Sequence, residues 1–143
     1  MSQNSRKLWF WPCLAWSLGV FSMIGIWMTV SVWLDQPCLW MAVLSAIDIG
    51  LLLRFTGITP GWPRFMGVII GTLLISVAAQ WLIAANAFGL VMGLLPLESA
   101  QMVGPVLVWE FTRLRILAGD WWWLLISFAI ALWFRFQKTG TVI

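Results

Sequence analysis

The chain alternates long apolar runs with short polar turns. No charged residue occurs from Leu8 to Leu34 or from Phe65 to Leu97, and two shorter apolar stretches end near Leu53 and Phe134. About 20 apolar residues in a helix cross the ~30 Å hydrocarbon core of a bilayer. The pattern therefore predicts an all-α integral membrane protein, a four-transmembrane-helix bundle with spans at about residues 8–34, 38–53, 65–86 and 116–134.

Turn signals separate these spans. Pro37 follows Asp35 and Gln36 in the first turn, and Arg54 and Arg64 bracket a second turn rich in Gly and Pro. The uncharged run 65–97 would make ~50 Å of helix, longer than one straight crossing, so we expect the third span to end near Asn86 and residues 87–96 to form a frayed or separate helix.

A less regular segment follows, in which charged and apolar residues mix. The Gly104-Pro105 pair is expected to break any helix, with Pro105 in the first turn of a new one. We interpret residues 99–117 as an outer-side interfacial helical segment of two short helices that lies on the membrane surface, with a shallow re-entrant loop as the alternative.

Composition narrows the class of protein. Apolar residues make up 62% of the 143 residues and charged residues only 9%, so we expect a single transmembrane domain, 1–143, and no separate soluble domain. Cys13 and Cys38 lie ~37 Å apart if the first span is helical, which is too far for a disulfide. The chain has no His. We expect no metal site, no cofactor and no nucleic-acid partner.

The basic residues predict the orientation. With four spans, six of the eight fall on one side, and cytoplasmic loops carry such an excess of Lys and Arg. These six are Arg6, Lys7, Arg54, Arg64, Arg135 and Lys138. Both termini are then cytoplasmic, and the connection from Leu97 to Asp120 is external. The expected location is the plasma membrane, which is the inner membrane if the source is a Gram-negative bacterium.

Asp48 is a carboxylate inside the second span. It precedes Arg54 by six residues, ~9 Å of helix, so it lies within the hydrocarbon if Arg54 marks the interface. Depth counting places Thr72 and Ser127 near the same level, with Ser45 one turn away. Such a carboxylate usually faces other helices or water. Helix packing or subunit contact is the first interpretation; proton or cation coupling and simple interfacial placement are the alternatives.

Small residues recur at every fourth position in three series. Such series allow helix backbones to approach closely in bilayers. The series are Ala42, Ala46 and Gly50; Gly67 and Gly71; and Ala85, Gly89 and Gly93. Packing within the bundle is the first interpretation, and contact with an oligomer or a partner is the alternative. Gln80 is expected to make an interhelical hydrogen bond.

The outer segment carries an interfacial charge cluster. Its members are Glu98, Glu110, Arg113, Arg115 and Asp120. Their spacing matches no catalytic or metal-binding motif, and Glu110 and Arg113 have the spacing of a helical ion pair, so we interpret the cluster as a solvated face. No phosphate loop, dinucleotide fingerprint or nucleophile motif occurs in the chain. We expect no catalytic residue.

Three functions are compatible with this pattern. The first is a structural or accessory subunit that associates with itself, as a homo-oligomer, or with a larger membrane complex, and is not an enzyme. The second is a proton- or cation-coupled transporter of small solutes centred on Asp48. The third is a lipid-handling enzyme that uses the outer carboxylates with Arg113 or Arg115.

Overall fold

The computed structural model describes residues 3–115 and 120–137. These residues form six helices and no strand, which confirms the predicted all-α class. In chain order the helices are α1 (Gln3–Leu34), α2 (Met41–Phe55), α3 (Trp62–Met92), α4 (Pro96–Met102), α5 (Pro105–Arg115) and α6 (Trp122–Phe136). Residues 116–119, the start of the expected last span, and Lys138 lie outside the described residues.

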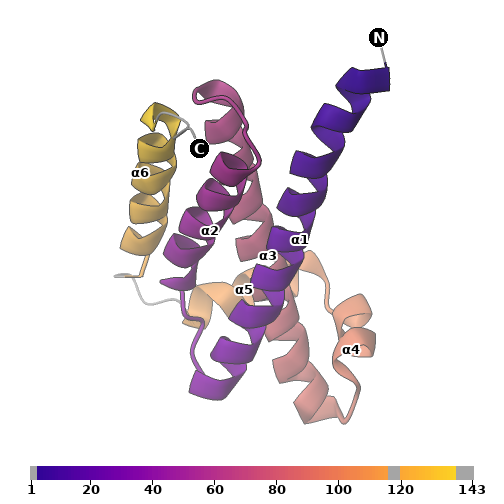
Figure 1. The fold of residues 1–143 in the computed structure, drawn as a ribbon. Coiled ribbons are helices and arrows are strands. Elements are labelled where there is room, and N and C mark those ends of the chain that lie inside the picture. Colours follow the sequence, from indigo (N-terminus) through magenta and orange to yellow (C-terminus); the bar gives the residue numbers. More distant parts are fainter. Residues whose placement is uncertain (1–2, 116–119, 138–143) are drawn as a thin grey trace.

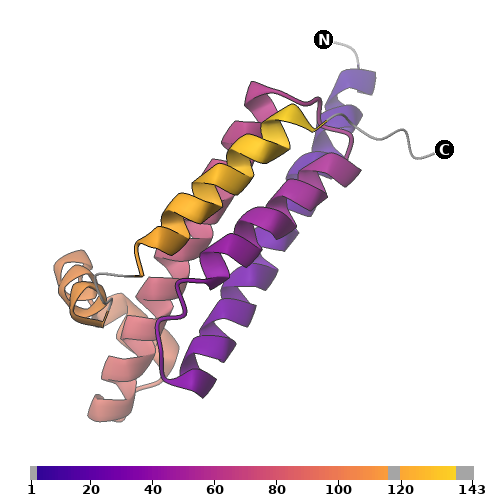
Figure 2. The same cartoon turned by 90° about the vertical axis from the view of Figure 1, so that its left-hand side faces the viewer.

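Four of the helices form a bundle. α2 and α3 pack on each other in the middle, α1 contacts both from one side, and α6 contacts both from the other. The start of α1, the α2–α3 turn and the end of α6 lie at one end of the bundle (Figures 1 and 2). We call this the terminal end. The turns after α1 and α3 lie at the opposite end.

The central helices differ greatly in length. The segments Phe10–Leu34 of α1 and Trp62–Met92 are each long and apolar enough to cross a membrane. α2 and α6 contain 15 residues each, about 22 Å of helix, which is less than the ~30 Å of a hydrocarbon core. Among the described residues, two helices pass as full spans, so the prediction of four full helical spans is not confirmed.

α3 continues past the point where we expected the third span to end. It is one unbroken helix of 31 residues as far as Met92, so the predicted end near Asn86 is wrong. Gly93 ends it: its N–H donates to the Gly89 carbonyl, and its left-handed backbone, φ 68°, turns the chain so that the Leu94 N–H donates to the same carbonyl (2.9 Å). α4 and α5 then fold back against α3. They form the two short helices expected within residues 99–117, and Pro105 begins the second one.

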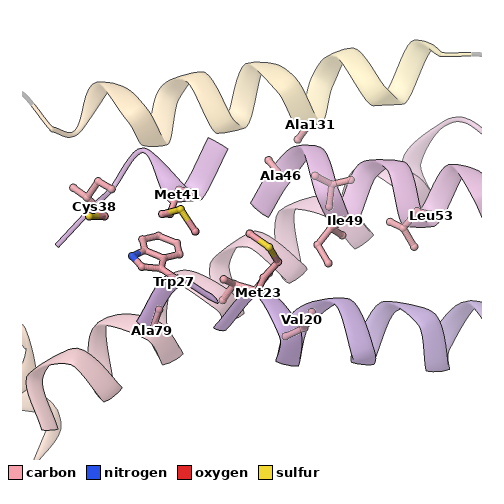
Figure 3. Close-up of a cluster of buried hydrophobic side chains, with 14 of the residues drawn as sticks. Val20, Met23, Trp27, Cys38, Met41, Ala46, Ile49, Leu53, Ala79 and Ala131 are labelled. Carbon is pink, nitrogen blue, oxygen red and sulfur yellow. The ribbon is translucent and has the colours of Figure 1, made fainter. Parts of the chain in front are cut away.

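The core lies where α1, α2 and α3 meet. Figure 3 shows Val20, Met23 and Trp27 of α1 facing Met41 and Ile49 of α2. Ala131 of α6 approaches Ala46 from the other side, and Ala79 belongs to α3 (Figure 3). Trp27, the largest of these side chains, is completely buried. Its burial fixes the position of the segment that follows α1.

That segment, residues 35–40, joins α1 to α2 without being helical. The Pro37 carbonyl accepts a hydrogen bond from Trp27 Nε1 (3.0 Å) and another from Gln80 Nε2 of α3 (3.3 Å). Gln80 thus makes a contact between elements, as expected, but to a backbone carbonyl of this link. Asp35 and Cys38 have positive φ angles, 50° and 46°, so the chain turns sharply here. The buried Cys38 and Leu39 anchor the link against the core.

Candidate functional site

Asp48 lies on the side of α2 that faces α1. A β-carbon built on Gly19 would be 3.7 Å from its Oδ2 atom. The side chain is half-buried, and within residues 3–115 and 120–137 it makes no hydrogen bond or ion pair. Ser45, one turn earlier, is buried and donates to the Met41 carbonyl of its own helix (2.8 Å). Asp48 is therefore an unpaired carboxylate beside a glycine of α1.

Thr72 and Ser127 lie elsewhere in the bundle. They line a groove of about 310 Å³ between α3 and α6, which we call the α3–α6 groove. Asp48 and Ser45 are not among its lining residues. Ser127 donates to the Trp123 carbonyl (2.8 Å), whereas the buried Thr72 hydroxyl has no partner in the described part of the chain. Asp48, Thr72 and Ser127, which were expected near one depth, are thus divided between two sides of the bundle, with Ser45 on the helix of Asp48.

The small-residue series face neighbouring elements of the same chain. Ala42 and Ala46 are completely buried. A β-carbon on Gly50 would lie 2.5 Å from the Phe134 ring of α6, one on Gly67 would lie 2.6 Å from Leu53 Cδ1, and one on Gly71 would lie 3.1 Å from Ile49 Cγ2. These glycines therefore allow α2, α3 and α6 to approach closely.

The third series has a different surrounding. Ala85 is completely buried, and its carbonyl accepts a hydrogen bond from Ser99 Oγ of α4 (2.7 Å). A β-carbon on Gly89 would lie 3.0 Å from the same hydroxyl. Gly93 serves as the cap of α3 and has no atom within 4 Å of its β-position. This series positions α4.

The outer charged residues are dispersed over three short elements. Glu98 is exposed on α4, where its Oε2 accepts from the Leu95 N–H (3.4 Å). Glu110 and Arg113 are exposed on α5, and no ion pair between them is present in the described chain. Asp120 precedes α6, and the Arg115 side chain lies outside the described part. Over residues 3–115 and 120–137, no three Cys, Asp or Glu side chains converge as metal ligands do.

An arginine cluster at the terminal end was not expected as a site. Arg64 is completely buried: Nη1 donates to the Gln137 carbonyl (2.9 Å), and Nη2 donates to the Ile58 carbonyl. Arg54 Nη1 donates to the side-chain oxygen of the same Gln137 (3.0 Å). The Arg135 guanidinium stands 5.0 Å from the Trp62 ring centre. Three cations therefore gather where α2 and α6 end and α3 begins.

The outward face of α1 was also missed. Ser22, Gly25 and Thr29 are exposed on one face of the helix, and a β-carbon on Gly25 would meet no atom within 4 Å. Thr29 also lines a groove of about 500 Å³ between α1 and Asn86 of α3. No hydrogen bond joins the Asn86 amide to any residue that the structure describes. The three-and-four spacing of Ser22, Gly25 and Thr29 in the sequence was the available signal.

Comparison with known proteins adds no relative from which a role can be transferred. No protein-family model, no curated protein and no solved structure matches this chain.

Proposed function

We propose that this chain is a small polytopic membrane protein that acts as a structural or accessory subunit and that docks a transmembrane helix, of a second copy or of a larger complex, on the outward face of α1. Only 22% of the most apolar stretch of α1 is buried inside the chain, whereas the core helix of a soluble protein is mostly buried. Large side chains such as Trp11, Leu18, Phe21 and Trp33 point outward. A bilayer is the environment that accepts such a helix.

The link before α2 supports a membrane crossing by a short helix. Non-helical backbone at membrane depth is tolerated where protein buries it and satisfies its polar groups. Two side chains satisfy the Pro37 carbonyl, and the Cys38 and Leu39 carbonyls accept bonds from Met41 and Ala42. Six residues span at most ~20 Å when fully extended, and this link spans less because it turns at Asp35 and Cys38. A hydrocarbon core of ~30 Å requires only ~8 Å beyond the ~22 Å of α2. We propose that link and helix together complete one crossing.

The distribution of charge supports the orientation. Arg54, Arg64 and Arg135 are at the terminal end, whereas Glu98 and Glu110 belong to the short helices that follow the far end of α3. Lys and Arg concentrate on the cytoplasmic side of membrane proteins. We therefore propose that the terminal end faces the cytoplasm and that the protein resides in the plasma membrane.

The observation that carries the docking proposal is the contrast between two glycines of one helix. Gly19 faces inward, and a β-carbon there would clash with Leu52 and lie near Ile49. Gly25 faces open space, although small residues in membrane helices are typical of close helix contacts. The adjacent groove offers the unpaired amide of Asn86, which a partner helix can satisfy.

The test compares the wild-type protein with Gly25→Leu. Gly104→Leu is the matched control, because Gly104 is also exposed and has no atom within 4 Å of its β-position. After purification in mild detergent and chemical crosslinking, we expect a stoichiometric homo-oligomer or complex for wild type and Gly104→Leu, and its loss for Gly25→Leu with unchanged helical circular dichroism. A monomeric wild-type protein without a partner, or undiminished association of Gly25→Leu, would contradict the proposal.

The unpaired carboxylate of Asp48 supports a second candidate, proton- or cation-coupled transport. Asp48 is the acidic residue of α1, α2, α3 and α6. An ionisable residue within a membrane-spanning segment typically contacts other helices or takes part in the passage of ions. In proteoliposomes, Asp48→Asn should then abolish ion-coupled solute flux while the chain keeps its fold. Unchanged flux would exclude this candidate.

A further inference from the structure

The α3–α6 groove is apolar along its depth. Leu73 and Phe128 form its exposed rims. The other lining residues are half-buried or buried: Ile69, Thr72, Ser76, Leu124, Ser127 and Ala131. Ser76 donates its hydroxyl to the Thr72 carbonyl (2.7 Å), as Ser127 does within α6, so these hydroxyls are already bonded to their own helices. An occupant therefore finds van der Waals contact and almost no free hydrogen-bonding group. A hydrocarbon chain meets that requirement.

The terminal mouth of the same interface is cationic. Arg135 is the last basic residue of α6 and lies one turn beyond Ala131, which lines the groove. Arg54 and Arg64 hold Gln137 directly after α6. No carboxylate of the described residues forms an ion pair with any of the three, so their positive charge is uncompensated within that part of the chain. The mouth has the charge that complements an anion.

Aromatic rings connect the mouth to the groove. The Arg135 guanidinium lies over Trp62 (5.0 Å), Trp62 packs edge-on against Phe65 (ring centres 5.4 Å apart), and Phe65 packs edge-on against Phe128 (5.9 Å). Phe128 lines the groove. Phe65 is buried and holds the exposed rings of Trp62 and Phe128 in place, so a ligand with an anionic head and an apolar tail can contact the cation, these two rings and the groove in sequence.

We propose that the α3–α6 groove binds one anionic phospholipid, whose phosphate is held by Arg135 and whose acyl chain passes the exposed rings of Trp62 and Phe128 into the groove. Arg54 and Arg64 add positive potential at the mouth without needing to touch the lipid. This proposal rests on the membrane location put forward above and not on docking at α1. The lipid comes from the leaflet at the terminal end, which is the anionic cytoplasmic one under the proposed orientation.

The experiment uses the full chain in detergent, titrated with phosphatidylglycerol or phosphatidylcholine of identical acyl chains and observed by native mass spectrometry. We expect one tightly retained phosphatidylglycerol per chain, at a concentration at least about five-fold lower than phosphatidylcholine requires, because one Arg near a charged headgroup has about that effect. Arg135→Gln should remove the preference. The matched control, Arg113→Gln, removes an exposed cation of α5 and should retain it.

A second variant tests the groove. Ser76→Leu fills it from α3 and should weaken retention of both lipids, and excess glycerol phosphate should displace neither. Equal binding of the two lipids by wild type, a retained preference in Arg135→Gln, or displacement by glycerol phosphate overturns the proposal. A change of oligomeric state in Ser76→Leu with undiminished lipid binding assigns the groove to a second copy instead. Gly25→Leu separates the two proposals, since it should abolish association and keep the lipid preference.

Discussion

Replacing the buried Arg64 tests whether the arginine cluster holds the terminal end together. In Arg64→Met the apolar stem is retained, while two hydrogen bonds from a charged donor are lost, one to Gln137 and one to Ile58. Hydrogen bonds to charged groups contribute about 1.5–3 kcal/mol each. Removing a buried cation offsets part of this loss, because Nε has no partner and the charge is expensive to bury.

We therefore expect Arg64→Met to lower the free energy of unfolding by about 2–4 kcal/mol. Arg64→Lys should be intermediate, since one ammonium cannot replace a forked guanidinium that reaches two carbonyls. Arg54→Met is the matched control: it removes the same charge from the same end of the bundle but only one hydrogen bond, from a half-buried side chain. Its cost should be about 1 kcal/mol or less.

The assay is unfolding by increasing mole fraction of sodium dodecyl sulfate in mixed micelles, followed by far-ultraviolet circular dichroism and by tryptophan emission. Arg64→Met and Arg54→Met change the net charge equally, so the difference between their stabilities reports the effect of burying Arg64. A stability of Arg64→Met within about 0.5 kcal/mol of wild type, or a greater loss for Arg54→Met, would show that the buried Arg64 does not hold the terminal end together.

Two further predictions concern the α1 side of the bundle. Trp27→Phe removes the indole donor to Pro37 and leaves a cavity, so we expect a loss of about 2–3 kcal/mol and faster maleimide labelling of the buried Cys38; unchanged labelling would show that Trp27 does not hold the link. Asp48→Leu removes an unpaired carboxylate beside Gly19, so the same detergent titration should show a gain of about 1–3 kcal/mol, whereas a loss would show that the carboxylate has a native partner outside the described chain.

The helical class and several boundaries follow from sequence because they depend on local signals. Pro105 begins a helix, and the basic turn between Arg54 and Arg64 ends one helix and precedes the next. The end of α3 was misjudged because a limit on membrane thickness was applied to a run that has no Pro between Pro63 and Pro96 and whose glycines before Gly93 do not interrupt the helix. A helix ends where a residue or a contact interrupts its backbone hydrogen bonds, and the thickness of a bilayer does not determine that position.

The candidate site was less predictable, because residue spacing gives depth but not direction. Asp48 and Thr72 were placed at similar depth, yet one faces α1 and the other lines the α3–α6 groove. Arg64 was interpreted as a boundary marker, and nothing in its local sequence distinguishes an arginine in solvent from one buried between two carbonyls. The packing of Gln137, 73 residues later, decides that outcome.

The Pro37 carbonyl accepts two hydrogen bonds, and under the proposed membrane location this has a consequence for how the chain enters the bilayer. One of its donors, Trp27, is synthesised before the link and the other, Gln80, 43 residues after it. Until α3 emerges from the translocation machinery, the Pro37 carbonyl lacks its hydrogen bond from Gln80. A backbone polar group without all its hydrogen bonds is unfavourable in lipid. Insertion of α1, α2 and α3 should therefore be concerted, with the early segments waiting at the translocon or its chaperones, and not a sequence of independently stable helices released one by one.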